Sequence, residues 1–321
     1  MIYSLMTYDC KKHFNVGDYI QSLAARQFLP RVDQYINREK LNEYYGPETK
    51  LIMNGWFMLH PENWPPSPNI NPLFISFHLN QTHAERILSK QGIAYLRRYK
   101  IGCRDHSTLN LLKAKGIDVF FSSCLTLTLG NSYRNSPGED IYFVDVLFKF
   151  PTPQKVFRSF NSFLKSVQRH EISRFGQRKK LLRKLFGNKI VEVAKDITHH
   201  YSADQYATED SRFELAEDLL KRYQKARLVV TSRIHCALPC LAMGTPVIFV
   251  DGCFDNSSDR WRLEGISSLF NIIQISGQKI TANFDYETVR NTAQIHNKTH
   301  HLEYIELLNQ HCKKFINNIE E

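Results

Sequence analysis

The sequence has no long apolar runs. No stretch approaches the roughly 20 apolar residues that span a bilayer, and residues 1–6 lack the basic start and apolar length of a signal peptide. We therefore expect a cytoplasmic protein without a transmembrane helix. Internal repeats and low-complexity tracts are also missing, which excludes repeat proteins and fibrous chains.

Paired cysteine motifs are missing too. The seven cysteines include no C-x-x-C pair, and an odd number in apolar surroundings does not fit a disulfide framework. Cys236 and Cys240 share one face of a predicted helix, but that helix is otherwise apolar, so packing is favoured over zinc binding. We expect no metal site.

Acidic residues are scarcer than basic ones. The 42 Lys and Arg against 32 Asp and Glu leave a formal net charge of +10, which calls for an anionic partner. Nucleic acid, an acidic membrane surface and a small anionic substrate all qualify. No zinc-finger, helix-turn-helix or RNA-binding signature accompanies the charge, so we do not expect nucleic acid.

Length and pattern indicate the fold class. With 321 residues, 42% of them hydrophobic, the chain can form two packed domains. Strand-like and helix-like patterns alternate along most of it, as in α/β proteins. Residues 130–140, rich in Asn, Ser, Pro and Gly, are the best candidate boundary. We predict an N-terminal domain over 1–135 and a C-terminal domain over 136–321.

Residues 226–250 carry the clearest functional pattern: a buried strand, a short helix closed by a glycine, and a second strand. Thr231 or Ser232 is expected to cap the helix. Arg233 and His235 lie where that helix begins, and a helix N-terminus favours anions. The pattern predicts an anion clamp beside a proton-transfer group, with a buried ion pair and a packing histidine as the alternative.

A second loop of this kind contains Asn15, Gly17 and Asp18, directly after the first predicted strand. Gly17 would let the backbone approach a ligand, and Asn15 and Asp18 can accept hydrogen bonds from sugar hydroxyls. The alternative is that Asn15 or Asp18 only caps the following helix.

Two further polar residues follow predicted strands. His78 comes after residues 73–77, and Arg104 comes after residues 100–103 and just before a predicted helix. Trp56 and Trp64 are candidates for stacking on a sugar ring, with packing as the alternative.

Three motifs carry a family resemblance. Ser232-Arg-Ile-His235, followed by Gly244-Thr-Pro246, resembles the late motif of the polysaccharide pyruvyltransferases. Asn15-Val-Gly-Asp18 is similar to the family's N-terminal element, and Cys103-Arg-Asp-His-Ser107 to its central Arg-Asp element. Ser123-Cys-Leu-Thr126 stands where the family often has a Pro-Asp-Pro-like element, so an acidic role there stays unassigned.

The resemblance implies an α/β protein with two Rossmann-like domains in a glycosyltransferase-B-like arrangement and an active site in the interdomain cleft. The acceptor side would be the N-terminal domain and the donor side the C-terminal one, with the last helix crossing back to the first. The implied reaction moves the enolpyruvyl unit of phosphoenolpyruvate onto two hydroxyls of a sugar or lipid-linked oligosaccharide as a ketal, without a cofactor.

Roles for residues follow from that reaction. Arg104 and Arg233 would clamp the donor across the cleft, and His235 would be the acid or base. The expected substrate-binding residues are Asn15, Gly17, Asp18, His78 and Ser232. The alternatives are a nucleotide-sugar glycosyltransferase, whose ribose would need an acidic residue from among Asp251, Asp255 and Asp259, and a non-catalytic anion- or glycan-binding protein.

The segment 152–185 is predicted to be helical, and residues 178–186 are strongly basic. We expect peripheral contact with an anionic membrane there, with the leucines and Phe186 at the interface. A solvated helix face is the alternative. Residues 189–193 read as a strand, residues 60–72 as an ordered loop, and residues 271–275 as the final strand.

Overall fold

The computed structural model describes residues 1–151, 156–157, 159–172, 176–252, 260–277, 279–292 and 294–318. The N-terminal part forms a six-stranded sheet in which every pair of neighbours is parallel. In spatial order its strands are β3 (Gln34–Asn37), β1 (Ile2–Thr7), β4 (Thr49–Phe57), β5 (Ile70–Leu79), β6 (Ile101–Cys103) and β7 (Val119–Phe121). Its central strands are largely buried and mostly apolar, as expected for parallel strands covered on both sides.

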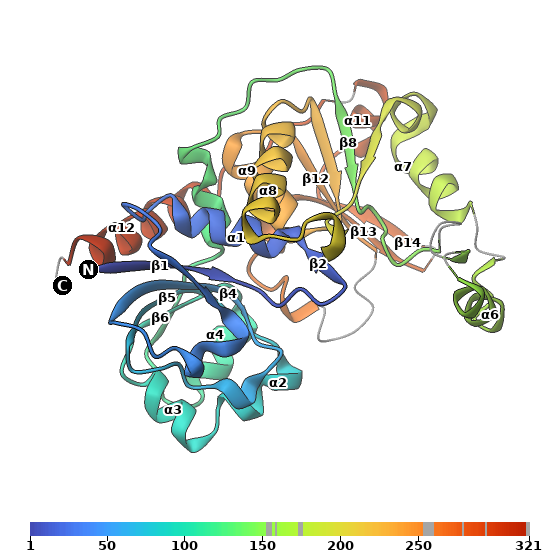
Figure 1. Ribbon diagram of the computed structural model, residues 1–321. Helices are drawn as coiled ribbons and strands as arrows, with labels where there is room; N and C mark the ends of the chain where they lie inside the picture. The colour runs from blue at the N-terminus through green and yellow to red at the C-terminus, as the bar shows by residue number, and fades with distance from the viewer. Residues whose placement is uncertain are drawn as a thin grey trace.

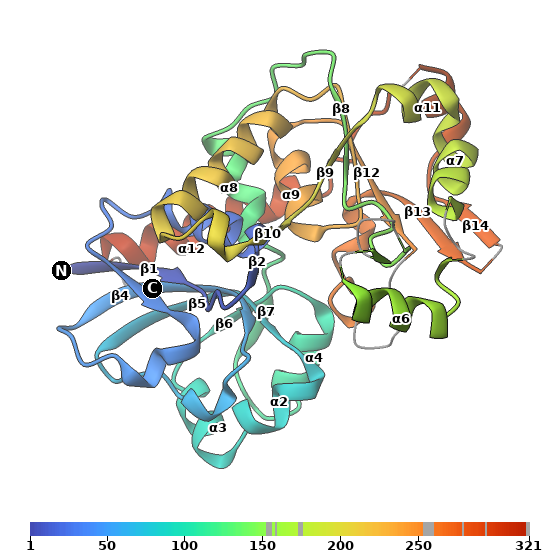
Figure 2. The same cartoon turned by 45° about the vertical axis from the view of Figure 1, so that its right-hand side comes forward.

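A second six-stranded sheet is parallel except for one edge hairpin, β13–β14. Its strands in spatial order are β14 (Lys279–Ala282), β13 (Asn271–Ser276), β12 (Val247–Asp251), β11 (Leu228–Thr231), β8 (Ile141–Val144) and β9 (Lys195–Ile197). Figures 1 and 2 show the two sheets side by side with helices between and around them. The prediction of a mixed α/β protein with Rossmann-like parallel sheets is confirmed.

Helices connect and cover these strands. They are α1 (Val16–Arg26), α2 (Gln81–Ile87), α3 (Lys90–Leu96), α4 (His106–Lys113), α6 (Phe160–Gln168), α7 (Gln177–Val193), α8 (Glu209–Gln224), α9 (Ile234–Met243), α11 (Tyr286–Thr292) and α12 (Leu302–Asn317). One core cluster contains buried residues of both sheets and of α1, α8 and α9. Tyr19 of α1 packs on Phe213 of α8 with ring centroids 5.1 Å apart. The two halves therefore share buried apolar surface.

A small ribbon also joins the halves. Strand β2 (His13–Asn15) pairs antiparallel with β10 (His200–Ser202), and the backbone N–H of Val16 donates to the carbonyl of His199 at 2.9 Å. This pairing holds the start of α1 against the second half of the chain. The loop before α1 is thereby positioned by both halves.

The last helix returns to the first sheet. Lys50 of β4 is buried, and its ammonium donates to the carbonyl of Ile316 at 3.2 Å and to that of Phe315. These bonds satisfy carbonyls at the end of α12, where a cation also interacts favourably with the negative end of the helix dipole. Figure 1 shows α12 beside the N-terminal strand.

Three local predictions are wrong. Residues 189–193 are the end of α7, which kinks at Gly187 (φ +76°) and buries Ile190, so this apolar run is a helix face. Strand β5 begins at Ile70, inside the segment predicted as a loop. The strand at 271–275 is not the last, because β14 pairs with it as a hairpin.

The predicted membrane contact through 178–186 needs a correction. Leu182, Leu185 and Phe186 are buried in a second core cluster under the second sheet, so they cannot enter a bilayer. Arg178 pairs with Asp196 at 2.9 Å, whereas the other cations of the stretch are exposed. Among the described residues, no helix is both long enough and apolar enough to span a membrane.

Candidate active site

A cavity of about 300 Å³ lies between the two halves. Its lining combines elements from both sheets, and nearly all of it lies just beyond the carboxyl end of a strand or at the start of a helix, where parallel sheets place their ligands. The lining residues are Asn15, Asp18, Trp56, His78, Asn80, Arg104, His235 and Arg262. Five of the eight predicted site residues are therefore gathered in one place.

Asn15 serves two purposes. Its side-chain oxygen accepts a hydrogen bond from the backbone N–H of Gly17 at 3.2 Å, which caps α1, and the same residue lines the cavity. The capping interpretation of Asn15 is therefore confirmed, and its role in binding a sugar stays a prediction.

Gly17 provides space rather than a contact. A Cβ at Gly17 would lie only 3.2 Å from the Cβ of His235 and 3.3 Å from its Nδ1. Any larger residue would force the His235 side chain to shift by a few tenths of an ångström. The glycine thus allows the N-termini of α1 and α9 to approach each other beside the cavity.

His235 lies in the first turn of α9 and is 8% exposed. Its Nε2 is buried and has no hydrogen-bond partner among the residues that the structure describes. Burial, with the charges of Arg104 and Arg262, lowers the pKa of His235 well below its usual value. The imidazole is therefore neutral at neutral pH, with a ring nitrogen left for a ligand.

His78 is held by a carboxylate. Its Nδ1 lies 2.6 Å from Oδ2 of Asp105, and the other Asp105 oxygen accepts from the backbone N–H of Thr108 at 2.8 Å, capping α4. Burial and the charge of Arg104 lower the pKa of His78 to about 4, against the opposing effect of Asp105. A neutral ring that donates from Nδ1 presents Nε2 as an acceptor.

Arg104 is the more deeply buried of the two arginines that line the cavity. Its side chain is 3% exposed, and its Nε lies 3.8 Å from Asp105, beyond hydrogen-bond distance. Nε has no hydrogen-bond partner within the described part of the chain. Because Asp105 is already bonded to His78 and Thr108, Arg104 retains capacity to bind an anion.

Asp18 is the acidic residue of the cavity. Loss of hydration raises the pKa of its carboxyl, although Arg38, Arg262 and Arg104 oppose this. The pKa of Asp18 and that of His235 are thus shifted in opposite directions within one cavity. Burial thus favours a protonated Asp18 and a neutral His235, the forms that can donate and accept a proton.

Trp56 reaches the cavity because of a bulge in β4. The register of β4 and β5 shifts between Met53 and Gly55, and Gly55 adopts a φ of +107° beside Gln21. Trp64, the other predicted stacking residue, is buried against Phe57, Phe77 and further aromatic rings. The packing alternative therefore holds for Trp64.

Arg233 lies elsewhere. It is the N-cap of α9, its Nε donates to Oδ2 of Asp145 at 2.8 Å, and its guanidinium lies 4.2 Å from the ring centroid of Phe148. It does not line the cavity. The donor-binding role of Arg233 stays a prediction, while the ion-pair alternative describes what the structure contains.

Ser232 is buried in a structural network. Its hydroxyl donates to the carbonyl of Val250 at 2.6 Å and accepts from the backbone N–H of Leu147 at 3.2 Å. It does not line the cavity, and neither Ser232 nor Thr231 caps α9. Its substrate-binding role also stays a prediction.

Arg262 is the cavity cation that was not predicted. It lies in a turn after β12, where no strand or helix pattern marks the position. The pair of arginines around Trp261 was the available signal. Of the acidic residues considered for a nucleotide ribose, Asp255 and Asp259 lie outside the described residues, and Asp251 lines a different cavity.

Comparisons with known proteins identify the family. The family model for polysaccharide pyruvyl transferase matches residues 15–253, about three-quarters of the chain. No curated protein matches. A crystal structure described as a functional uncharacterized protein, KP1_0663 from Klebsiella pneumoniae subsp. pneumoniae NTUH-K2044, is 14% identical over 85% of this chain and 93% of that one, with a TM-score of 0.44. The chain belongs to the polysaccharide pyruvyl transferase family and is a transferase.

Proposed function

We propose that the enzyme transfers the enolpyruvyl unit of phosphoenolpyruvate onto two hydroxyls of one sugar residue, forming a pyruvate ketal. One observation carries the proposal: two arginines and a neutral histidine with an unpartnered buried nitrogen line one cavity at the N-termini of α1 and α9. Such a site suits a small, highly charged anion beside a proton-transfer group.

Arg104 and Arg262 replace the predicted pair of Arg104 and Arg233 as the donor clamp. Phosphoenolpyruvate carries a carboxylate and a phosphate, and a guanidinium binds either group through two parallel hydrogen bonds. The positive ends of the α1 and α9 helix dipoles add to the potential. Asn15 and His78 offer hydrogen-bond acceptors toward the sugar hydroxyls.

The proton transfers divide between Asp18 and His235. Asp18, whose pKa is raised, donates a proton to the methylene carbon of the donor, so that C2 becomes electrophilic. One sugar hydroxyl then attacks C2, the C2–O bond to phosphate breaks, and the second hydroxyl closes the ketal. His235, neutral and unpartnered, accepts a hydroxyl proton. In total two hydroxyl protons leave, one ends on the methyl group, and one leaves with phosphate or buffer.

We also propose the glycosyltransferase-B-like arrangement. The support is that two separate, mainly parallel sheets contribute to one cavity between them. The prediction of domains over 1–135 and 136–321 agrees with where the second sheet begins, at Ile141, and remains to be tested by separate expression.

The test is a donor and acceptor screen. The enzyme is incubated with phosphoenolpyruvate and acceptors that contain galactose, mannose or N-acetylmannosamine, and phosphate release and acceptor mass are measured. We expect phosphate release that depends on acceptor, with a mass gain of one pyruvate minus one water. Nucleoside diphosphate release from a nucleotide sugar would instead support a glycosyltransferase, and binding without turnover would support a non-catalytic protein.

A peripheral membrane contact remains part of the proposal, but through α6. Phe157, Phe160, Leu164 and Val167 are 59%, 75%, 44% and 45% exposed. Phe160, Leu164 and Val167 are spaced by four and three residues, which places them on one face of α6, and Phe157 lies just before this helix. Figure 1 shows α6 projecting from the body of the molecule.

Charge complementarity supports an anionic bilayer as the occupant of this face. α6 and its C-cap expose the cations Lys165 and Arg169, and α7 exposes Lys179, Lys180, Arg183 and Lys184. Aromatic and aliphatic side chains surrounded by cations are typical of helices at an anionic lipid interface. Such a contact would bring the enzyme to a lipid-linked oligosaccharide.

A further inference from the structure

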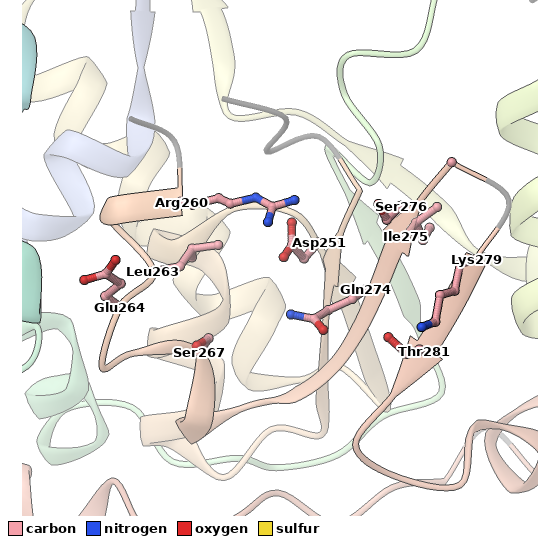
Figure 3. Close-up of a pocket in the computed structure, with 11 residues that line it drawn as sticks. Asp251, Arg260, Leu263, Glu264, Ser267, Gln274, Ile275, Ser276, Lys279 and Thr281 are labelled. Carbon is pink, nitrogen blue, oxygen red and sulfur yellow. The ribbon is translucent and has the colours of Figure 1, made fainter. Parts of the chain in front are cut away.

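A second cavity, of about 490 Å³, lies at the edge of the second sheet. It opens over the β13–β14 hairpin, beside the carboxyl end of β12, and residues 260–267 form its opposite wall (Figure 3). Its lining is mostly polar: Asp251, Arg260, Leu263, Glu264, Ser267, Gln274, Ile275, Ser276, Gly277, Lys279 and Thr281. None of these residues lines the first cavity.

The floor of this cavity is a regular polar surface, which we call the polar shelf. Asp251 of β12 is in register with Gln274 of β13, and Gln274 is in register with Thr281 of β14. Ser276 pairs with Lys279 in the next row. Residues in register project from the same face, so the rows present hydrogen-bonding groups at the spacing of strands, about 4.8 Å.

The chemistry of the polar shelf suits a glycan better than an anion. Its two cations, Arg260 and Lys279, are matched by two carboxylates, Asp251 and Glu264. The remaining polar groups are an amide and hydroxyls, which donate and accept as sugar hydroxyls do. Leu263, in the opposite wall, adds apolar surface for the C–H face of a ring.

One segment joins the polar shelf to the active site. Arg262 lines the first cavity, whereas its neighbours Leu263 and Glu264 line the second. Glu264 accepts a hydrogen bond from the hydroxyl of Ser107 at 2.6 Å, and its carbonyl accepts from the backbone N–H of His106 at 3.2 Å. The segment is thus fixed to the start of α4, next to Arg104.

We propose that the polar shelf binds the sugar residues adjacent to the one that receives the pyruvyl group. This proposal rests on the proposed function, and it specifies the acceptor as an oligosaccharide of at least two residues. Its neighbouring sugars lie on the polar shelf while the reacting sugar enters the first cavity past Arg262. A monosaccharide would fill only the first cavity.

The double variant Gln274→Ala, Thr281→Ala tests this proposal. Both side chains are exposed, so the fold should tolerate the change, and a thermal melt checks this. We expect KM for a disaccharide acceptor to rise about tenfold, because two hydrogen bonds are lost, while kcat and KM for phosphoenolpyruvate stay constant. Kinetics with the matching methyl monosaccharide should not change. Gln310→Ala, on the exposed face of α12, is the matched control.

Unchanged disaccharide KM in the double variant would overturn the proposal, as would an equal loss with the monosaccharide. Saturation-transfer NMR with the same disaccharides, recorded without phosphoenolpyruvate, separates this failure from that of the proposed function. If the wild type consumes no phosphoenolpyruvate, the proposed reaction fails, whereas glycan binding that the double variant abolishes would still support the polar shelf. Absence of glycan binding in the wild type would refute it.

Discussion

Arg104 and Arg233 occupy equivalent places in the two halves of the molecule, each between the end of a parallel strand and the start of a helix. Their surroundings differ. Arg233 is neutralised by Asp145 at 2.8 Å, whereas the carboxylate beside Arg104 is 3.8 Å away and already bonded to His78. Position in the fold makes an arginine a candidate for binding an anion, and its carboxylate partner decides whether it is free to do so.

The largest expected effect in this comparison concerns His235, which lies on α9 two residues after Arg233 but faces the cavity of Arg104. His235→Gln should lower kcat by about 10²–10⁴-fold, since an amide can hydrogen-bond but cannot take up a proton. Donor affinity and thermal stability should stay near wild type. Steady-state kinetics with a melting curve check this, and an equal loss of stability would show a packing role.

The donor clamp comes next. Arg104→Ala and Arg262→Ala should each lower kcat/KM for phosphoenolpyruvate, corresponding to a loss of about 2–5 kcal/mol of transition-state stabilisation. Each removes a charge-assisted pair from a poorly hydrated cavity. Arg104→Lys should recover little, since an ammonium cannot reproduce the planar fork. Initial rates at varied donor concentration measure this. Near-normal rates in Arg262→Ala would show that Arg262 does not bind the donor and would favour Arg233 as the second clamp.

The buried His78 should make stability depend on pH. Its folded pKa of about 4 lies below the unfolded value of 6.5, so the unfolded chain binds the extra proton first. The stabilisation is present above pH 6.5 and is lost as pH falls toward 4, by on the order of 3 kcal/mol. Denaturant unfolding at several pH values should show this slope, and His78→Gln should reduce it, leaving the part that comes from His235, whose pKa is also lowered. A flat wild-type profile would contradict the neutral, buried state of His78.

The Arg233–Asp145 ion pair should contribute to stability but not to turnover. Arg233→Ala should lower the free energy of unfolding by about 1–3 kcal/mol, because Asp145 loses its partner. Asp145→Asn is the matched change, and a double-mutant cycle measures the coupling. Loss of turnover with unchanged stability would give Arg233 a direct role in catalysis.

The smallest effect is expected at the membrane face. Replacing any one of Lys179, Lys180, Arg183 and Lys184 of α7 with Gln should weaken sedimentation with phosphatidylserine vesicles by roughly 1 kcal/mol, the contribution of one charge near the surface. Phe160→Ser with Leu164→Ser should weaken it further and leave activity on a water-soluble acceptor intact. If the wild type does not bind these vesicles even at low salt, the membrane contact is refuted.

Much of the site was predictable because its residues follow recognisable strands. Asn15, His78, Arg104 and His235 each occur where a strand ends or a helix begins, and parallel sheets bring such positions together. Local pattern also predicted the mixed α/β class. Sequence reasoning can recognise such positions without knowing their partners.

The rest depended on contacts between distant residues. Arg233 and Asp145 are 88 positions apart, so no local pattern shows that they pair. Arg262 lies in a turn without an apolar pattern, and it enters the cavity only through the contact of Glu264 with α4. The helix end at 189–193 was mistaken for a strand because a short apolar run fits both periods.

Calorimetric titration of phosphoenolpyruvate into the wild type, Arg104→Ala and Arg233→Ala tests the assignment of the donor site most directly. We predict that the wild type and Arg233→Ala bind the donor with similar Kd, while Arg104→Ala binds it at least 30-fold more weakly, as the loss of about 2 kcal/mol requires. Wild-type affinity in Arg104→Ala together with lost binding in Arg233→Ala would contradict it.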